Sequence, residues 1–233
     1  MTDLTQPRDT TRTYQRIARN LAARIASGDF KPGERLPSER DLAASLNVSR
    51  TSLREALLAL EIAQLVEIRV GSGVFVREAP SVGLSFESML VSEPGPFEII
   101  EMRRVIEGES AFRAALKGDE HQIAAIQEVI DAVTDSVIAT FETFDVWDRL
   151  FHIRIAEATH NSLFVQMIGS LWDMKNNPMW DTWYHGSRDI ENRVRSAQDH
   201  REIFAFIQNH HPDHARTAMM AHTDRLIQRF MRF

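Results

Sequence analysis

Four side chains in the second half of the chain combine the residue types and the spacing of a metal site. Asp148 and His152 are four residues apart, so they share one face of a helix, where apolar neighbours turn both inward. His200 and His222 each lie in a later apolar stripe with helical spacing. Buried polar groups need partners, and a divalent ion is one that imidazole and carboxylate groups bind together. The spacing leaves two interpretations open, a metal site or core histidines that are satisfied by hydrogen bonds.

The composition limits both the kind of metal site and the kind of protein. The chain has 233 residues and no cysteine, which excludes a thiolate site, a cysteine nucleophile and a disulfide scaffold. Nitrogen and oxygen donors suit zinc, with nickel, manganese or iron as alternatives. No apolar run approaches the ~18 residues of a membrane span, and the N-terminus contains no apolar signal core. We therefore expect a cytoplasmic protein without a membrane partner.

The charge is divided unevenly along the chain. Residues 1–80 hold 12 basic and 10 acidic residues for a net charge of +2. Residues 81–233 hold 15 basic and 23 acidic residues for a net charge of −8. Halves of opposite sign predict two domains that face different partners. The total of −6 therefore does not exclude nucleic acid as a partner of the first half.

Prolines and glycines gather at residues 80–96, which is typical of a linker. We expect one domain at residues 10–78 and a second at residues 96–233. The linker between them, at residues 79–95, includes an apolar piece at residues 84–90 with the length of one or two helical turns.

Helical and alternating patterns follow each other in the first domain. Apolar residues at helical spacing predict helices at residues 13–26, 39–46 and 50–63. The second and third are joined by Asn47-Val48-Ser49, which is helix-turn-helix spacing. Two alternating segments then flank the turn Gly71-Ser72-Gly73, as in a β-hairpin. The order predicts a winged helix-turn-helix.

The start of the third helix has the chemistry of a DNA contact. Its hydroxyl side chains let backbone amides approach phosphates, and the helix dipole favours an anion there. Its arginines can bind guanine bidentately in the major groove, and glycine in the wing lets the backbone approach DNA closely. The alternative is an ordinary capped helix with solvated arginines. The candidate DNA-binding residues are Arg40, Ser49, Arg50, Thr51, Ser52, Arg54 and Gly71.

The second domain is helical throughout in its periodicity, so we expect an all-α bundle. Pro178 and Gly186 interrupt the chain between the fourth and fifth of the expected helices. All four tryptophans lie between Trp147 and Trp183, which predicts the wall of a cavity or an interface. The expected helices are at residues 97–117, 119–139, 142–159, 162–175, 189–209 and 212–231.

The first domain resembles the winged helix of GntR-type transcription regulators. The resemblance rests on the stretches from Gly33 to Ala43, from Val48 to Leu57 and from Gly71 to Val76. It implies operator contacts at the matching positions, which are all the DNA-binding candidates above except Ser52.

The second domain resembles the FCD effector domain of the FadR branch of that family. The resemblance rests on Asp148 to His152, Ala156 to Asn161, Asp199 to Ile203 and Ala218 to His222. It implies that Asp148, His152, His200 and His222 bind a metal beneath a ligand cavity. One departure is His160, where many members have glycine.

Further segments, among them Gly95 to Glu98 and Asn177 to Trp180, are similar to repressors of hexuronate catabolism. A 2-hydroxycarboxylate can chelate the two positions that four protein ligands leave open on a six-coordinate metal. Arg103 could bind the same carboxylate bidentately, and the alternative is an ion pair with Glu107. The candidate effector-binding residues are Arg103, Asn177, Trp180 and Ser196.

These observations predict a homodimeric repressor that is not an enzyme and that a sugar acid such as a hexuronate releases from DNA. Dimerisation is expected because two recognition helices on an inverted repeat gain contacts and specificity. Two rival hypotheses remain. In the first, the metal itself is the effector; in the second, the quartet is the centre of a metalloenzyme, which would leave the winged helix unexplained.

Overall fold

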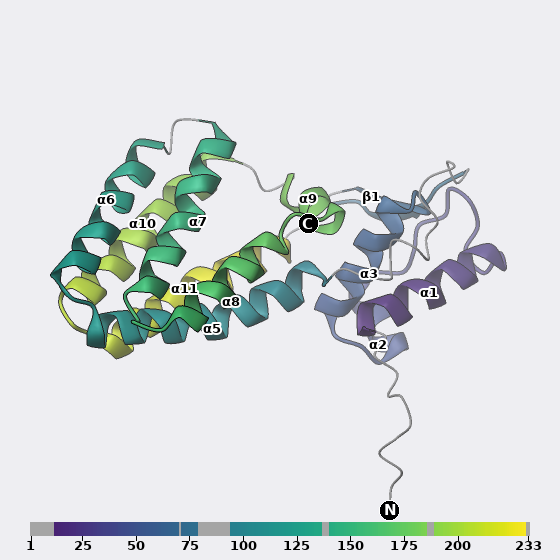
Figure 1. The fold of residues 1–233 in the computed structure, drawn as a ribbon. Coiled ribbons are helices and arrows are strands. Elements are labelled where there is room, and N and C mark those ends of the chain that lie inside the picture. The colour runs from purple at the N-terminus through teal and green to yellow at the C-terminus, as the bar shows by residue number, and fades with distance from the viewer. Residues whose placement is uncertain (1–11, 70, 79–93, 137–139, 186–188, 232–233) are drawn as a thin grey trace, which may run out of the picture. The chain divides into compact units, whose positions relative to one another are not determined.

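A computed structural model of the chain describes residues 12–69, 71–78, 94–136, 140–185 and 189–231 (Figure 1). The chain divides into two compact units, Met1–Gly95 and Pro96–Phe233, and each is considered by itself. The predicted linker and its apolar piece at residues 84–90 lie almost wholly outside the described residues. Among the described helices, none combines the length and the apolar character that crossing a membrane requires.

The first unit is a three-helix domain with a two-stranded hairpin, as predicted. Helix α3 packs against α1, α2 and β1, and β1 pairs with β2 in antiparallel register, with Val66 opposite Val76. The elements are α1 (Thr13–Ala26), α2 (Glu39–Leu46), α3 (Arg50–Ile62), β1 (Val66–Arg69) and β2 (Gly73–Val76).

Capping side chains set the limits of the helix-turn-helix. The Ser38 hydroxyl accepts a hydrogen bond from the Asp41 amide at the start of α2. Asn47 ends α2 in the left-handed conformation, with φ of 53°, which asparagine tolerates better than most residues. The Ser49 hydroxyl then accepts from the Ser52 amide and starts α3. The three-residue turn follows directly from these local preferences.

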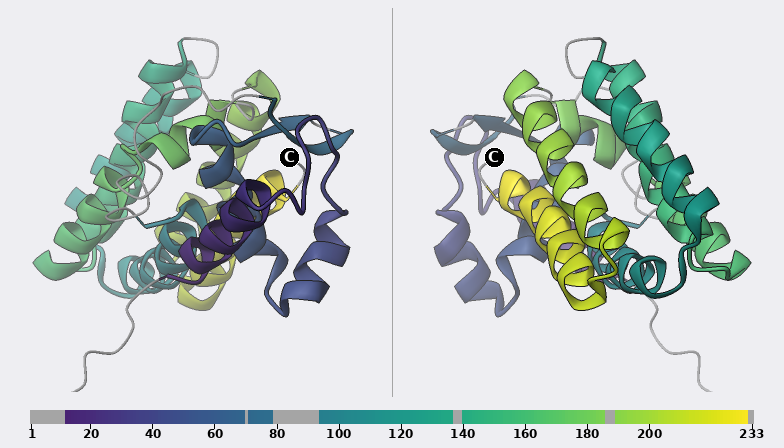
Figure 2. Two further views of the ribbon diagram at one scale, coloured as in Figure 1. Left: turned by 90° about the vertical axis from the view of Figure 1, so that its right-hand side faces the viewer. Right: turned by 90° about the vertical axis from the view of Figure 1, so that its left-hand side faces the viewer.

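The second unit is an all-α bundle, also as predicted (Figures 1 and 2). Helix α5 packs along α11, α6 packs along α7, and α10 contacts α5, α6 and α11. Helix α8 lies against α5 and α7. The helices are α5 (Pro96–Lys117), α6 (Glu120–Ser136), α7 (Phe141–Glu157), α8 (Ser162–Asp173), α9 (Pro178–His185), α10 (Ile190–Gln208) and α11 (Pro212–Phe230).

One helix was not predicted from the sequence. The sequence predicts a break at Pro178, but α9 begins at this residue. Proline is favoured in the first turn of a helix, where its missing N–H leaves no hydrogen bond unmade. The Asn177 side chain caps this start by accepting from the Trp180 amide at 2.9 Å. The part of the chain that carries Trp180 and Trp183 is therefore a short helix.

The bundle core is apolar and continuous between α5, α6, α7, α10 and α11. Phe151 and Ile155 of α7 meet Ile203 and Ile207 of α10 in it, and all four are almost fully buried. His160, just after α7, adopts a left-handed conformation with φ of 53°. Glycine adopts that conformation with less strain than histidine does.

Candidate nucleic-acid interface and metal centre

The start of α3 presents a cluster of hydroxyl groups. The Ser49 hydroxyl lies 2.8 Å from the Thr51 hydroxyl and 2.9 Å from the Ser52 hydroxyl. Arg50 is exposed directly beside them. Small hydroxyls and an exposed guanidinium at a helix N-terminus are suited to an anion such as a DNA phosphate.

The other candidates for DNA contact differ in their environments. Arg40 projects into solvent from the first turn of α2, with 86% of its side chain exposed. Gly71 is exposed at the wing tip with φ of 73°, a conformation that only glycine adopts freely. Gly73 has φ of 108°, and the Arg35 guanidinium lies close to it. A Cβ atom at this position would lie only 2.7 Å from Nε of Arg35. Both glycines are thus required by the geometry of the wing.

Arg54 is placed differently from the exposed arginines. Its Nε donates to Oε2 of Glu39 at 2.6 Å, and only 10% of its side chain is exposed. The pair ties α3 to the first turn of α2. This contact indicates a structural role in holding the two helices, whatever contact Arg54 makes with DNA.

Sequence reasoning missed one cation of the wing. Arg69, at the end of β1, is exposed; its guanidinium pairs with Glu67 at 2.8 Å and lies 4.4 Å from the Phe75 ring centroid. A single arginine within an alternating segment carries no signal by itself. It becomes a candidate for phosphate contact only because the hairpin places it near the wing tip.

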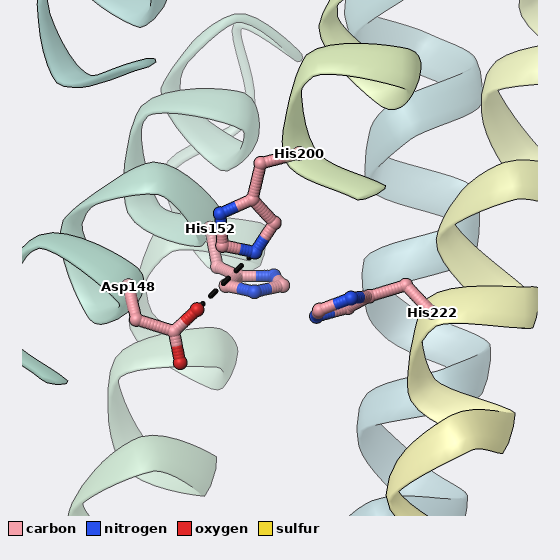
Figure 3. A group of neighbouring side chains, drawn as sticks. All are labelled: Asp148, His152, His200 and His222. Carbon is pink, nitrogen blue, oxygen red and sulfur yellow. Dashed lines mark ion pairs between the residues drawn. The ribbon is translucent and has the colours of Figure 1, made fainter. Parts of the chain in front are cut away.

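The predicted metal ligands converge in the second unit. Asp148 and His152 come from α7, His200 from α10 and His222 from α11, and their side chains point toward one another (Figure 3). One potential ligand atom of each lies within 4.8 Å of those of the others. The spacing of Asp148 and His152 predicts their shared face, whereas the meeting with His200 and His222 depends on how three helices pack.

The cluster is buried and its polar atoms are incompletely satisfied. His152, His200 and His222 are at most 4% exposed. Nε2 of His200 lies 3.2 Å from Oδ1 of Asp148, but without the alignment of a hydrogen bond. Both ring nitrogens of His152 and of His200 lack an aligned hydrogen bond among the described residues, although Nδ1 of His152 lies close to the carboxylate of Glu107. Several buried nitrogen and oxygen atoms without hydrogen bonds therefore lie close together. This arrangement fits the ligands of a metal ion better than it fits a hydrogen-bonded core.

Two carboxylates support the imidazoles from outside. Asp199 accepts from Nδ1 of His222 at 3.2 Å and is itself held by Arg225, whose Nε donates to it at 2.7 Å. Glu107 lies 2.9 Å from Nδ1 of His152. Histidines that bind a metal commonly direct the second nitrogen to a carboxylate, which orients the ring and selects the tautomer. The pattern leaves Nε2 of His222 facing the cluster.

The protonation states suit the same chemistry. Burial lowers the pKa of His222 to about 4 and outweighs the hydrogen bond to Asp199. Burial also lowers the pKa of His152, against the opposing effect of Glu107. For Asp148, burial favours the neutral form, but the contact with His200 outweighs it and the pKa is lowered. At neutral pH His152 and His222 are therefore neutral and Asp148 is ionised, which are the forms that bind metals.

Arg103 lies deep beside this cluster. It is 2% exposed, and its Nε and Nη2 donate to the two oxygens of Glu107 at 2.7 and 3.3 Å. The ion pair that the sequence offered as the alternative role is therefore present, but it is buried and not at the surface. Two of the five N–H groups of the guanidinium account for it, so the pair does not preclude a second carboxylate.

The remaining effector candidates are all buried. The Asn177 side chain makes local hydrogen bonds within the turn. Its Nδ2 donates to the Met174 carbonyl, and its Oδ1 caps α9. Trp180 packs edge-on against Trp183, with ring centroids 4.9 Å apart. Ser196 lies one turn before His200 on the buried face of α10. Asn177 thus has a local structural role, while Trp180 and Ser196 stay candidates for effector contact.

A winged helix-turn-helix joined to an all-α domain defines a class of protein, the two-domain DNA-binding regulators. The chain matches two family descriptions in that order. Residues 13–76 match "Bacterial regulatory proteins, gntR family", and residues 98–225 match the FCD domain.

Relatives of known identity align along nearly the whole chain. The Uxu operon transcriptional regulator of Escherichia coli (strain K12) is 33% identical over 226 residues, which cover 95% of this chain and 88% of that protein. The Exu regulon transcriptional regulator of the same strain is 34% identical over 230 residues, which cover 95% and 84%. This chain therefore belongs to the gntR family of bacterial regulatory proteins, carries an FCD domain and is a transcription regulator.

Solved structures agree with the fold. Streptococcus agalactiae GntR matches with a TM-score of 0.50 at 22% identity and covers 92% of this chain and 99% of its own. Escherichia coli McbR/YncC matches with a TM-score of 0.50 at 19% identity and covers 94% and 97%. At these identities the likeness concerns the fold alone.

Proposed function

We propose that this regulator represses its target genes by binding operator DNA as a homodimer, and that a sugar acid such as a hexuronate releases it. The observation that carries the proposal is the buried quartet of Asp148, His152, His200 and His222 in the FCD domain. The names of the Uxu and Exu relatives support the choice of a sugar acid.

A divalent transition metal fits the quartet, with zinc first and nickel, manganese or iron as alternatives. The unsatisfied nitrogens of His152 and His200 and the carboxylate support behind His222 favour this fit. When bound, the ion would supply a positive charge and open positions for oxygen atoms of an acid.

The surrounding residues would hold the organic effector. Arg103 is buried beside the quartet and retains donors that Glu107 does not use. Its guanidinium would bind the effector carboxylate, and Ser196 would donate to a hydroxyl group. Trp180 would pack against the carbon skeleton of the sugar.

We infer that DNA is bound by the first turn of α2, the start of α3 and the wing. Arg40 and Arg50 are exposed and would carry the contacts, with the hydroxyls of Ser49, Thr51 and Ser52 at the phosphates. The effector must bind one arrangement of the two winged helices better than the other, since equal affinity would shift nothing. Release from the operator is the outcome that we expect.

A thermal-shift screen of sugar acids, with and without a chelator, tests the effector assignment. We expect D-glucuronate or D-galacturonate to raise the melting temperature of the metal-loaded protein and to weaken operator binding. If no acid of the panel raises the melting temperature or weakens operator binding, the proposal is wrong. Metal-dependent operator binding without any organic acid would favour the second candidate, a metal-sensing regulator, which the all-protein donor set of the quartet also fits.

A further inference from the structure

A second buried cation lies near the quartet, and nothing in the proposed function employs it. Lys175 follows the last turn of α8 and precedes α9. It is 7% exposed. Its Nζ lies 3.6 Å from the ring centroid of Trp172, 5.2 Å from that of Trp180 and 5.7 Å from that of Tyr184. The ammonium group is therefore enclosed mainly by aromatic faces.

Few hydrogen-bond acceptors among the described residues surround the ammonium group of Lys175. Lysine has three N–H donors, and one of them reaches Oδ1 of Asp145 at 3.3 Å. Asp145 is 40% exposed, so water solvates much of its carboxylate charge. Cation–π contacts with the aromatic rings offset part of the cost of burying the charge. Two donors remain directed into an aromatic environment without an acceptor among the described residues.

Lys175 and the metal quartet share Trp172 as a neighbour. The centroid of Trp172 lies 5.3 Å from that of His152, and its Nε1 donates to Oε1 of Glu107. Arg103 also lies over Trp172, with its Cζ 4.2 Å from the ring centroid. Trp172 thus has Lys175 and Arg103 at its faces and a proposed metal ligand beside it.

We propose that Lys175 forms a second effector subsite, which donates hydrogen bonds to an oxygen of the sugar acid at the end remote from its carboxylate. This inference rests on the proposed function. Aromatic side chains with a few placed polar groups are the usual walls of small-molecule sites. The rings of Trp172 and Trp180 would pack against the C–H groups of the sugar, while the ammonium group binds its hydroxyl or carbonyl oxygens.

The subsite determines which acids are preferred. A hexuronate has oxygens far from its carboxylate that can reach Lys175, whereas a short 2-hydroxy acid such as lactate has none. Both can bind through their carboxylate end. Lys175 therefore selects long polyhydroxylated acids over short ones, because a buried donor that is left unpaired disfavours the wrong ligand.

Titration calorimetry of Lys175→Met on the metal-loaded full-length protein tests this assignment. The probes are D-glucuronate, D-galacturonate and L-lactate. We expect hexuronate affinity to fall at least tenfold and lactate affinity to change by less than twofold. Lys117→Met, at an exposed lysine in the last turn of α5, is the matched control and should leave every affinity unchanged.

Two further measurements separate a binding role from a structural one. Methionine has a similar length and suits aromatic surroundings, so the effector-free melting temperature and the metal content should be retained. If the methionine variant does not fold, Lys175→Gln keeps a donor of similar reach and should give an intermediate loss. Unchanged hexuronate affinity in the variant would overturn the subsite alone. Absence of hexuronate binding by the unaltered protein would overturn both the subsite and the proposed function.

Discussion

The two units hold their candidate functional residues in opposite ways. In the first unit, Arg40 and Arg50 stand in solvent on neighbouring helices, and their positions follow from local capping. In the second, Asp148, His152, His200 and His222 are buried and come from three helices. Exposed groups can be altered with little effect on folding, whereas buried polar groups are coupled to stability. Variants should therefore behave differently in the two units.

The largest effect is expected for His200→Ala. Removing one of four donors should abolish metal loading, and with it the stabilisation that a bound metal gives, about 4 kcal/mol when free metal exceeds its dissociation constant a thousandfold. Elemental analysis and melting curves with and without metal measure both. His121→Ala, at an exposed histidine of α6, is the control. Full metal occupancy in His200→Ala would show that the quartet is not the site.

The metal-free protein should also lose stability in acid. Burial lowers the pKa of His222 to about 4, from an ordinary value of 6.5, so its stabilising contribution is complete above pH 6.5. As the pH falls from 6.5 to about 4, His222 is protonated in the unfolded chain but stays neutral in the folded one. This difference lowers the free energy of unfolding by on the order of 3 kcal/mol. Denaturant titrations across this range measure the loss. In His222→Gln the free energy of unfolding should depend less steeply on pH. An equal slope in that variant would mean that another group causes the loss of stability in acid.

A surface variant should show the converse pattern. Arg50→Ala is expected to weaken operator binding by about 1–3 kcal/mol, the range for loss of one bidentate base contact. Its melting temperature and metal content should stay unchanged, because Arg50 is exposed. Band-shift titration at fixed salt measures the affinity, with Arg16→Ala on α1 as an exposed control. Unaltered operator affinity would remove Arg50 from the interface.

Arg54 should be the exception within the first unit, with the smallest effect. Because it is paired with Glu39 at 2.6 Å and 10% exposed, Arg54→Ala should lower stability by about 1 kcal/mol. Glu39→Ala should cause a similar decrease, since it removes the acceptor of the same contact. Thermal melts of both variants and of the double variant measure the coupling. Full additivity of the two changes would mean that the pair contributes nothing to stability.

Local patterns predicted most of the fold. The helix-turn-helix depends on Ser38, Asn47 and Ser49, whose preferences act within a few residues. Helix α9 is not visible in the sequence because Pro178 indicates an interruption, whereas the Asn177 cap makes this proline the first residue of a helix. A helix of eight residues carries too little periodicity to be recognised from its sequence pattern.

The sites were predictable in proportion to how local they are. Asp148 and His152 are neighbours on one helix turn, so their pairing is visible in the spacing. Lys175 was missed because an isolated lysine in a chain has no pattern, and its burial against Trp172 arises only from packing. Asp199 was likewise named only as part of a motif, although it orients His222.

The sequence by itself determined the two-domain order, the winged helix and the residue types that can bind DNA or a metal, because these depend on short-range periodicity and capping. The tertiary structure decided the rest. Packing of α7, α10 and α11 brought the four candidate ligands together, buried Arg103 and Lys175 beside them, and paired Arg54 with Glu39. Contacts between residues far apart in the chain depend on how whole helix faces fit, and no local pattern encodes that fit.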